Sequence, residues 1–170
     1  KNLNLNVNLD DKSKETFEKY KVYWMIENAT LPVIESDIAL QKSEELYFST
    51  KINYYELKTS TRRVNYGGLT TSVKIMNGVY LRGGSIHRDY VTDDNWKLID
   101  EGQMYLTNKR IIFIGERKNK TILLKRILGV EGYSDGIEIQ KDTGPKTIFL
   151  FEYKPDICYL IINRLLQEQH

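Results

Sequence analysis

The chain has 170 residues and is 41% hydrophobic, which is enough for one full core and too little for two. Its 25 basic and 23 acidic residues leave a net charge of +2, and this balance argues against a dedicated nucleic-acid binder, in which Lys and Arg far outnumber Asp and Glu. A single cysteine, Cys158, excludes an intrachain disulfide and a cysteine-rich metal site, so we expect a cytoplasmic setting.

Residues 1–36 read as an N-terminal extension to a domain that spans residues 37–170. The first ten residues alternate Leu or Val with Asn, a pattern typical of an edge strand or of a flexible leader. Asp10 and Asp11 are placed to cap a helix over residues 12–27. Pro32 predicts a linker over residues 28–36. The chain begins at Lys1 and not at Met, so we expect a fragment of a longer protein.

The predicted N-terminal helix carries large aromatic side chains. Phe17, Tyr20 and Trp24 recur at the spacing of one helical face. The apolar surface is widened at the C-terminal end of the helix by Val22, Tyr23, Met25 and Ile26. A lone helix of this length has to pack against something to be stable. Two alternatives are open: the helix docks on the domain, or its aromatic face is offered to a partner, including a second copy of the chain in a homodimer.

Residues 46–151 read as β-hairpins in series, with short apolar or β-branched runs separated by Gly, Asn, Asp or Pro. The sharpest signal is Asn77-Gly78 between two apolar runs, because both positions of such a turn need positive φ. Strands are predicted over residues 46–58, 72–76, 79–82, 96–106, 111–113, 122–124, 130–133, 137–139 and 148–151. The fold class is therefore α+β and mainly β, with antiparallel pairing.

An apolar helix is predicted at the end of the chain, from Pro155 to Glu168. Proline is tolerated in the first turn of a helix, and an acidic residue such as Asp156 is favoured there. Leu160 and Leu165 belong to a series of apolar residues at helical spacing. We expect this helix to close one end of the sheet.

One segment resembles a known signature. Residues Gly102 to Phe113, GQMYLTNKRIIF, resemble the G-x-x-x-L-T-N-x-R-I-x-F signature of GRAM domains and of bacterial pleckstrin-homology-like (PH-like) domains. The segments Gly78 to Gly84 and Tyr133 to Ile137 are similar to segments of a family of bacterial and phage proteins of unassigned function. The resemblance covers residues 40–166.

The resemblance implies a PH-like split β-barrel of seven to eight antiparallel strands, capped by the C-terminal helix, in a bacterial protein. It also implies a module that is not an enzyme and that binds protein or peptide partners, or lipid headgroups. No cofactor is expected. The setting is then cytoplasmic, with association to a membrane surface as an alternative.

Basic residues gather where lipid-binding PH-like domains hold a headgroup. Lys58, Arg62 and Arg63 fall in the loop after the first long strand, and Arg82 and Arg88 lie near the next open end. The guanidinium fork of arginine suits phosphate recognition. Loops of ordinary domains are also charged, so a ligand-binding role for these five residues is a hypothesis with a solvated surface as its alternative.

A second basic set follows the signature. Lysines beside short strands discourage pairing between sheet edges, and we interpret the set in this way, ahead of nucleic-acid or membrane contact. Its members are Lys109, Arg110, Arg117, Lys118, Lys120, Lys125 and Arg126.

The sequence gives little sign of catalysis or metal binding. His87 stands beside Arg88 and Asp89 without a nucleophile motif. The carboxylates from Asp93 to Glu101 lack the spacing of a calcium loop. We therefore predict no catalytic residue and no metal site. The leading interpretation is a non-enzymatic module that binds a protein or peptide, through loops at one end or an exposed strand edge, and the alternative is recognition of anionic lipid.

Overall fold

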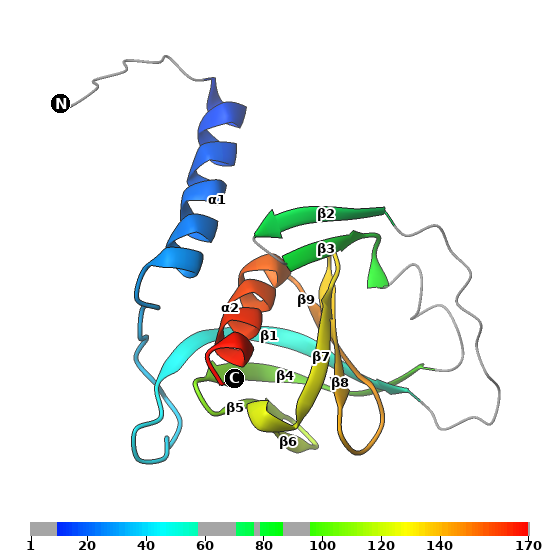
Figure 1. Cartoon of the computed structure of the whole chain (residues 1–170). Helices are drawn as coiled ribbons and strands as arrows, with labels where there is room; N and C mark the ends of the chain where they lie inside the picture. The colour runs from blue at the N-terminus through cyan, green and yellow to red at the C-terminus, as the bar shows by residue number, and fades with distance from the viewer. Residues whose placement is uncertain (1–9, 58–70, 77–78, 87–95, 170) are drawn as a thin grey trace.

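The chain folds into one nine-stranded sheet with a long helix near each end of the sequence (Figure 1). The computed structural model describes residues 10–57, 71–76, 79–86 and 96–169. The helices are α1 (Asp11–Asn28) and α2 (Pro155–Gln167), with a short 3-10 helix, η2 (Leu124–Arg126). The strands are β1 (Leu46–Leu57), β2 (Thr71–Met76), β3 (Val79–Gly83), β4 (Trp96–Thr107), β5 (Arg110–Gly115), β6 (Asn119–Leu123), β7 (Ile127–Gly132), β8 (Gly136–Lys141) and β9 (Thr147–Phe151).

The strands follow the order β2-β3-β7-β8-β9-β1-β4-β5-β6, so β2 and β6 are the edges of a sheet that is not closed. From β7 to β6 in this order, seven strands form an unbroken antiparallel run. The mainly β class and both helices are confirmed. The prediction that all pairs are antiparallel is wrong, because Leu81 of β3 pairs with Gly132 of β7 in parallel. The sheet also has nine strands, as the sequence pattern indicates, and not the seven to eight that the resemblance implies.

The parallel pair follows from the place of the β2-β3 hairpin in the chain. The hairpin comes between β1 and β4, yet β1 already has β4 on one side and β9 on the other. The hairpin can therefore join the sheet only at a free edge. It does so at β7, which runs in the same direction as β3. Pairing of β2 with β3 confirms the predicted hairpin. The expected N-terminal leader, the loop over residues 59–68 and the turn residues 77 and 78 lie outside the described residues.

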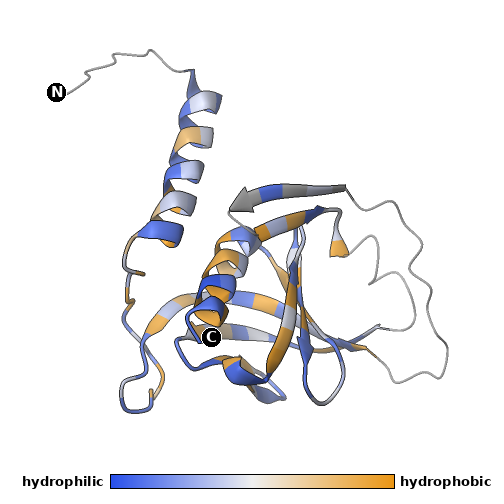
Figure 2. Ribbon diagram, in the orientation of Figure 1, coloured by the Kyte–Doolittle hydropathy of each residue, from blue (hydrophilic) through white to orange (hydrophobic). Residues whose placement is uncertain are grey.

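The main core lies between the sheet and α2. Figure 2 shows apolar residues both on the strands and on this helix. Tyr54 of β1 is fully buried, and its ring meets edge-on the rings of Phe113 at 5.2 Å and Phe149 at 5.5 Å. These arrangements are favoured for aromatic pairs. Leu160 and Ile162 are fully buried on the helix side. The C-terminal helix therefore covers the core, as expected.

The turn between β4 and β5 holds the segment that precedes β1. The buried carboxylate of Glu44 accepts two hydrogen bonds from the guanidinium of Arg110, at 2.8 and 3.0 Å. The Thr107 hydroxyl donates to the same carboxylate at 2.8 Å, and the Asn108 amide donates to the Ser43 carbonyl at 3.1 Å. Burial raises the pKa of Glu44, but hydrogen bonds, that from Arg110 foremost, outweigh it and lower the pKa to about 2.

Candidate functional site

Helix α1 packs on α2 through one side of its C-terminal half (Figure 1). Tyr23 and Ile26 are buried in this contact. The guanidinium of Arg164, on α2, donates hydrogen bonds to the carbonyls of Ile26, at 2.6 Å, and of Ala29. Carbonyls at the end of a helix have no donor from a following turn, so Arg164 supplies one. The C-terminal end of α1 is therefore held, while its N-terminal half projects from the body of the protein.

Asp156, in the first turn of α2, provides the second link to α1. The Lys19 ammonium lies 3.1 Å from its carboxylate, and the Tyr23 hydroxyl donates to the same oxygen. Burial raises the pKa of Asp156, but the hydrogen bonds from Tyr23 and Lys19 outweigh burial and hold the pKa below its ordinary value. The carboxylate is therefore ionised at neutral pH, where it also complements the dipole at the start of α2.

A cleft of about 930 Å³ opens between α1 and the body of the protein. Its walls come from α1, from β3, from the turn between β7 and β8, and from the start of α2. Apolar and aromatic surface is supplied by Tyr20, Leu81, Tyr153, Pro155 and Ile157, among others. Tyr153 is 67% exposed. The cleft is thus a groove with exposed aromatic walls.

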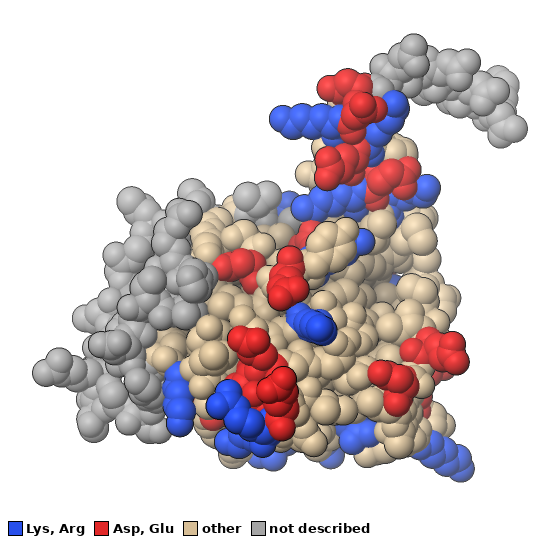
Figure 3. All heavy atoms as spheres, turned by 180° about the vertical axis from the view of Figure 1, so that it is seen from behind, with Lys and Arg blue, Asp and Glu red and all other residues tan. Residues whose placement is uncertain are grey.

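The charged groups along the cleft are mostly engaged with each other or with aromatic rings. Arg82 lies 3.1 Å from the Glu131 carboxylate and 6.0 Å from the centre of the Tyr133 ring. The Lys154 ammonium lies 4.8 Å from the centre of the Tyr153 ring. Viewed from behind, acidic and basic side chains mingle along α1 (Figure 3). The cleft therefore offers apolar and aromatic surface with both signs of charge and no strong excess of either.

The residues predicted to bind a ligand are only in part described. Arg82 lines the cleft and pairs with Glu131. Lys58, Arg62, Arg63 and Arg88 lie outside the described residues, so the structure does not place them beside Arg82.

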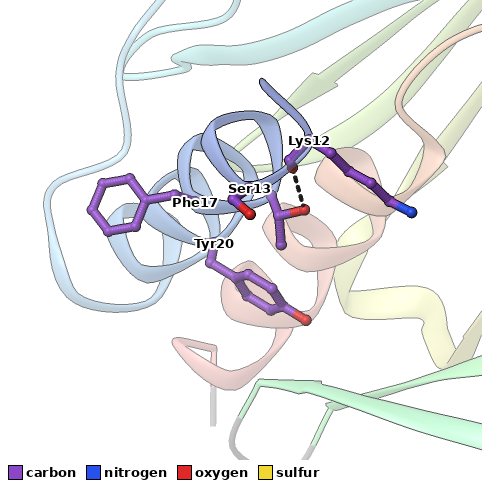
Figure 4. Close-up of a pocket in the computed structure, with 5 residues that line it drawn as sticks. Lys12, Ser13, Phe17 and Tyr20 are labelled. Carbon is purple, nitrogen blue, oxygen red and sulfur yellow. Dashed lines mark hydrogen bonds between the residues drawn. The ribbon is translucent and has the colours of Figure 1, made fainter. Parts of the chain in front are cut away.

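The aromatic residues predicted to bind a partner are exposed on α1. Phe17, Tyr20 and Trp24 are 59%, 60% and 62% exposed. Figure 4 shows the rings of Phe17 and Tyr20 extending outward from the helix, beside a shallow hollow that Ser13 also lines. The helix does dock on the domain, but through Tyr23 and not through these three rings. Of the three, Tyr20 also lines the cleft.

The sequence marked two residues that line the cleft, Arg82 and Tyr20, but it did not indicate the contacts that form the cleft. Tyr23 and Asp156 are 133 positions apart, so no local pattern indicates that they meet. The sequence marked Asp156 only as favourable for a helix start. Tyr153 lies two residues before Pro155, the predicted start of the C-terminal helix. An aromatic residue so close to a helix start could have been considered as a candidate binding residue.

Metal ions are held by clusters of His, Cys, Asp and Glu side chains, and bilayers are crossed by long apolar helices. Within the described ranges, no cluster of three or more His, Cys, Asp or Glu side chains is arranged to hold a metal ion. No helix in the described part of the chain combines the length and the apolar character needed to cross a bilayer.

Comparison with known proteins gives a structural likeness but no family. No family model matches the sequence, and no curated protein matches it. Among solved structures, the chain is similar to the C-terminal domain of an unknown protein from Leishmania infantum, with 10% sequence identity and a TM-score of 0.40. The match covers 74% of this chain and 87% of that chain.

Proposed function

We propose that this chain is a non-enzymatic binding module of the PH-like type that engages a protein or peptide partner through the cleft beside α1. In keeping with the bacterial resemblance of its signature, we place it in the bacterial cytoplasm. The PH-like assignment is supported by the run of seven antiparallel strands, from β7 to β6, and by the single C-terminal helix that covers the core.

The observation that carries the binding role is the composition of the cleft walls. Tyr20 and Tyr153 are about two-thirds exposed, and Lys154 and Arg82 lie against aromatic rings. Tyrosine and arginine are enriched in protein interfaces, because each combines a large apolar area with polar groups that can hydrogen-bond. The near balance of charge along the cleft favours a peptide with apolar anchors over a highly charged ligand.

Peptide selection on the whole chain, followed by measurement of affinity, tests this proposal. Peptides selected from a displayed random library should bind in the micromolar range and lose about tenfold or more in affinity to Tyr153→Ser and Tyr20→Ser, a loss of about 1.4 kcal/mol. Both side chains are exposed, so the variants should fold normally. Leu128→Ser is the matched control, because Leu128 is 67% exposed on β7 and lies outside the cleft.

Co-sedimentation with vesicles separates the two kinds of partner. A protein or peptide module should not need acidic lipid. If the chain instead binds anionic vesicles, loses this binding as salt rises, and yields no peptide that depends on Tyr153, then the lipid alternative replaces the peptide proposal. Loss of vesicle binding in Arg62→Gln and Arg63→Gln would assign that binding to the basic loop.

A further inference from the structure

The cleft beside α1 has no free strand edge in the walls that the structure describes. Strand β3, which forms one wall, already has β2 on one side and β7 on the other. The edges of the sheet are β2 and β6, and none of the described lining residues comes from either of them. A peptide in the cleft is therefore not held as an added strand, and side chains have to recognise it.

Tyrosine is the most frequent residue in the walls of the cleft. The described lining residues include Tyr20, Tyr23, Tyr133 and Tyr153. The hydroxyl of Tyr23 donates to Asp156, and that of Tyr133 donates to Glu131 at 3.1 Å. The hydroxyls of Tyr20 and Tyr153 make no hydrogen bond in the described part of the chain, and both side chains are exposed. The cleft therefore offers two exposed rings whose hydroxyls are free to donate.

Two charged residues of the cleft also lack an ion pair among the described residues. Glu15 lies on the α1 wall, and Lys154 lies on the facing side, at the start of α2. The other charged lining residues pair within the protein, namely Glu18 with Lys21, Lys19 with Asp156, and Arg82 with Glu131. A ligand that complements the cleft therefore brings a positive group for Glu15 and acceptor atoms for Lys154.

An extended proline-rich segment matches these features. In the polyproline II conformation the backbone has no internal hydrogen bonds, so its carbonyls are free to accept. The Tyr20 and Tyr153 hydroxyls and the Lys154 ammonium can donate to such carbonyls, while the tyrosine rings pack against proline. A peptide helix satisfies its own carbonyls and would leave these donors unused.

We infer that the cleft takes a proline-rich peptide segment with a Lys or Arg residue that pairs with Glu15. The inference rests on the binding role proposed above and names the class of its partner. Helix α1 lies outside residues 40–166, so the resemblance of the signature does not imply this site. Polyproline II segments are extended before they bind, so docking costs them little conformational entropy.

Selection on the whole chain from two displayed libraries tests the partner class. One library is fully random and the other fixes the pattern Pro-x-x-Pro. Proline should be enriched among binders from the first library, and the second should yield the tighter binders. Replacement of both prolines by alanine in the best peptide should weaken its binding by about tenfold or more.

Two tyrosine variants test donation by the hydroxyl. Tyr153→Phe keeps the ring and removes the donor, so the best peptide should bind about fivefold more weakly. Tyr80→Phe is the matched control, because Tyr80 is exposed on β3 and does not line the cleft, and it should bind as wild type.

The pairing with Glu15 has its own test. A selected peptide with arginine should bind the wild type several-fold more tightly than its glutamine analogue, and this difference should shrink as salt rises. In Glu15→Gln the difference should disappear. Glu27→Gln is the matched control, because Glu27 is exposed on the same helix outside the cleft lining, and it should keep the difference.

The outcomes separate this inference from the proposed function. Peptides that depend on Tyr153 but show no enrichment of proline, or that bind equally well without their prolines, would overturn the partner class and leave the binding role standing. A preference for arginine that persists in Glu15→Gln would overturn the pairing with Glu15. If no selected peptide depends on Tyr153, the proposed function is wrong, and this inference is wrong with it.

Discussion

At the scale of the residue, Arg110 and Glu44 form the most buried ion pair that the structure describes. The side chain of Glu44 is fully buried and that of Arg110 is 17% exposed. Two nitrogens of the guanidinium donate short hydrogen bonds to the two carboxylate oxygens, so the ion pair is bidentate. Removal of either partner leaves the other with an unmatched charge in the protein interior.

Arg110→Met should therefore be strongly destabilising. We expect a loss on the order of 3 kcal/mol in the free energy of unfolding, because the Glu44 carboxylate stays buried without its partner. Urea unfolding at pH 7, followed by circular dichroism, measures this loss. Arg117→Met is a suitable comparison, because the Arg117 side chain is 75% exposed beside Asp100, and its loss should be well under 1 kcal/mol.

The same carboxylate makes stability depend on pH. The pKa of Glu44 is about 2 in the folded protein and about 4.5 as an ordinary glutamate. A carboxyl whose pKa is depressed by folding stabilises the folded state above its unfolded pKa, and this contribution is lost as the pH falls from about 4.5 towards 2. Urea unfolding of Glu44→Gln should show a flatter decline over this window than that of the wild type. Glu152→Gln, at an exposed position, should follow the wild type.

At the scale of elements, local patterns located most helices and strands within one or two residues. The helices predicted over residues 12–27 and 155–168 span Asp11–Asn28 and Pro155–Gln167. The hairpin predicted at 72–76 and 79–82 is formed by β2 and β3. These elements are set by short-range features such as capping residues, a turn dipeptide and the periodicity of apolar side chains, all of which the sequence displays directly.

The docking of α1 is different, because its determinants are distant in sequence. The sequence suggested Phe17, Tyr20 and Trp24 as the main apolar face, with Tyr23 and Ile26 only widening it, because helical spacing aligns the first three rings. The buried face is set instead by Tyr23, whose ring packs while its hydroxyl reaches Asp156. Such a contact depends on where α2 lies, and that position is fixed only when the sheet has formed.

Tyr23→Phe tests the link between the two helices. The variant keeps the ring and removes the hydrogen bond to Asp156, so we expect a loss of about 1 kcal/mol, confined to the docking of α1. Amide hydrogen exchange should become faster in α1 and remain unchanged in β1 and β4. Tyr20→Phe is matched in chemistry, and the Tyr20 side chain is 60% exposed, so exchange should stay as in the wild type. Equal exchange in both variants would contradict the assigned link.

At the scale of the whole molecule, two tryptophans report on two parts of the fold. Trp24 lies on α1 and is 62% exposed, whereas Trp96 of β4 is buried with Ile86, Tyr133 and Ile148. Helix α1 buries few of its own side chains, while the sheet and α2 share the main core. Regions with few buried contacts open at lower free energy than the core, so the two parts should differ in stability.

Fluorescence of the wild type and of Trp24→Phe resolves the two signals. The variant, which retains Trp96, should emit at shorter wavelength and be quenched less by acrylamide than the wild type. In urea, the difference signal from Trp24 should change at a lower concentration than the signal of Trp96. A single coincident transition would show instead that α1 and the sheet unfold as one unit.

The Leu-Thr-Asn turn has a consequence for how related sequences are grouped. Thr107, Asn108 and Arg110 are all engaged with the residues just before β1, and none of them lines the cleft. Chains that share these residues can keep this anchor of the first strand whatever they bind. Under the binding role proposed above, a classification by partner has to compare the side chains around Tyr153 and Arg82, which the signature does not include.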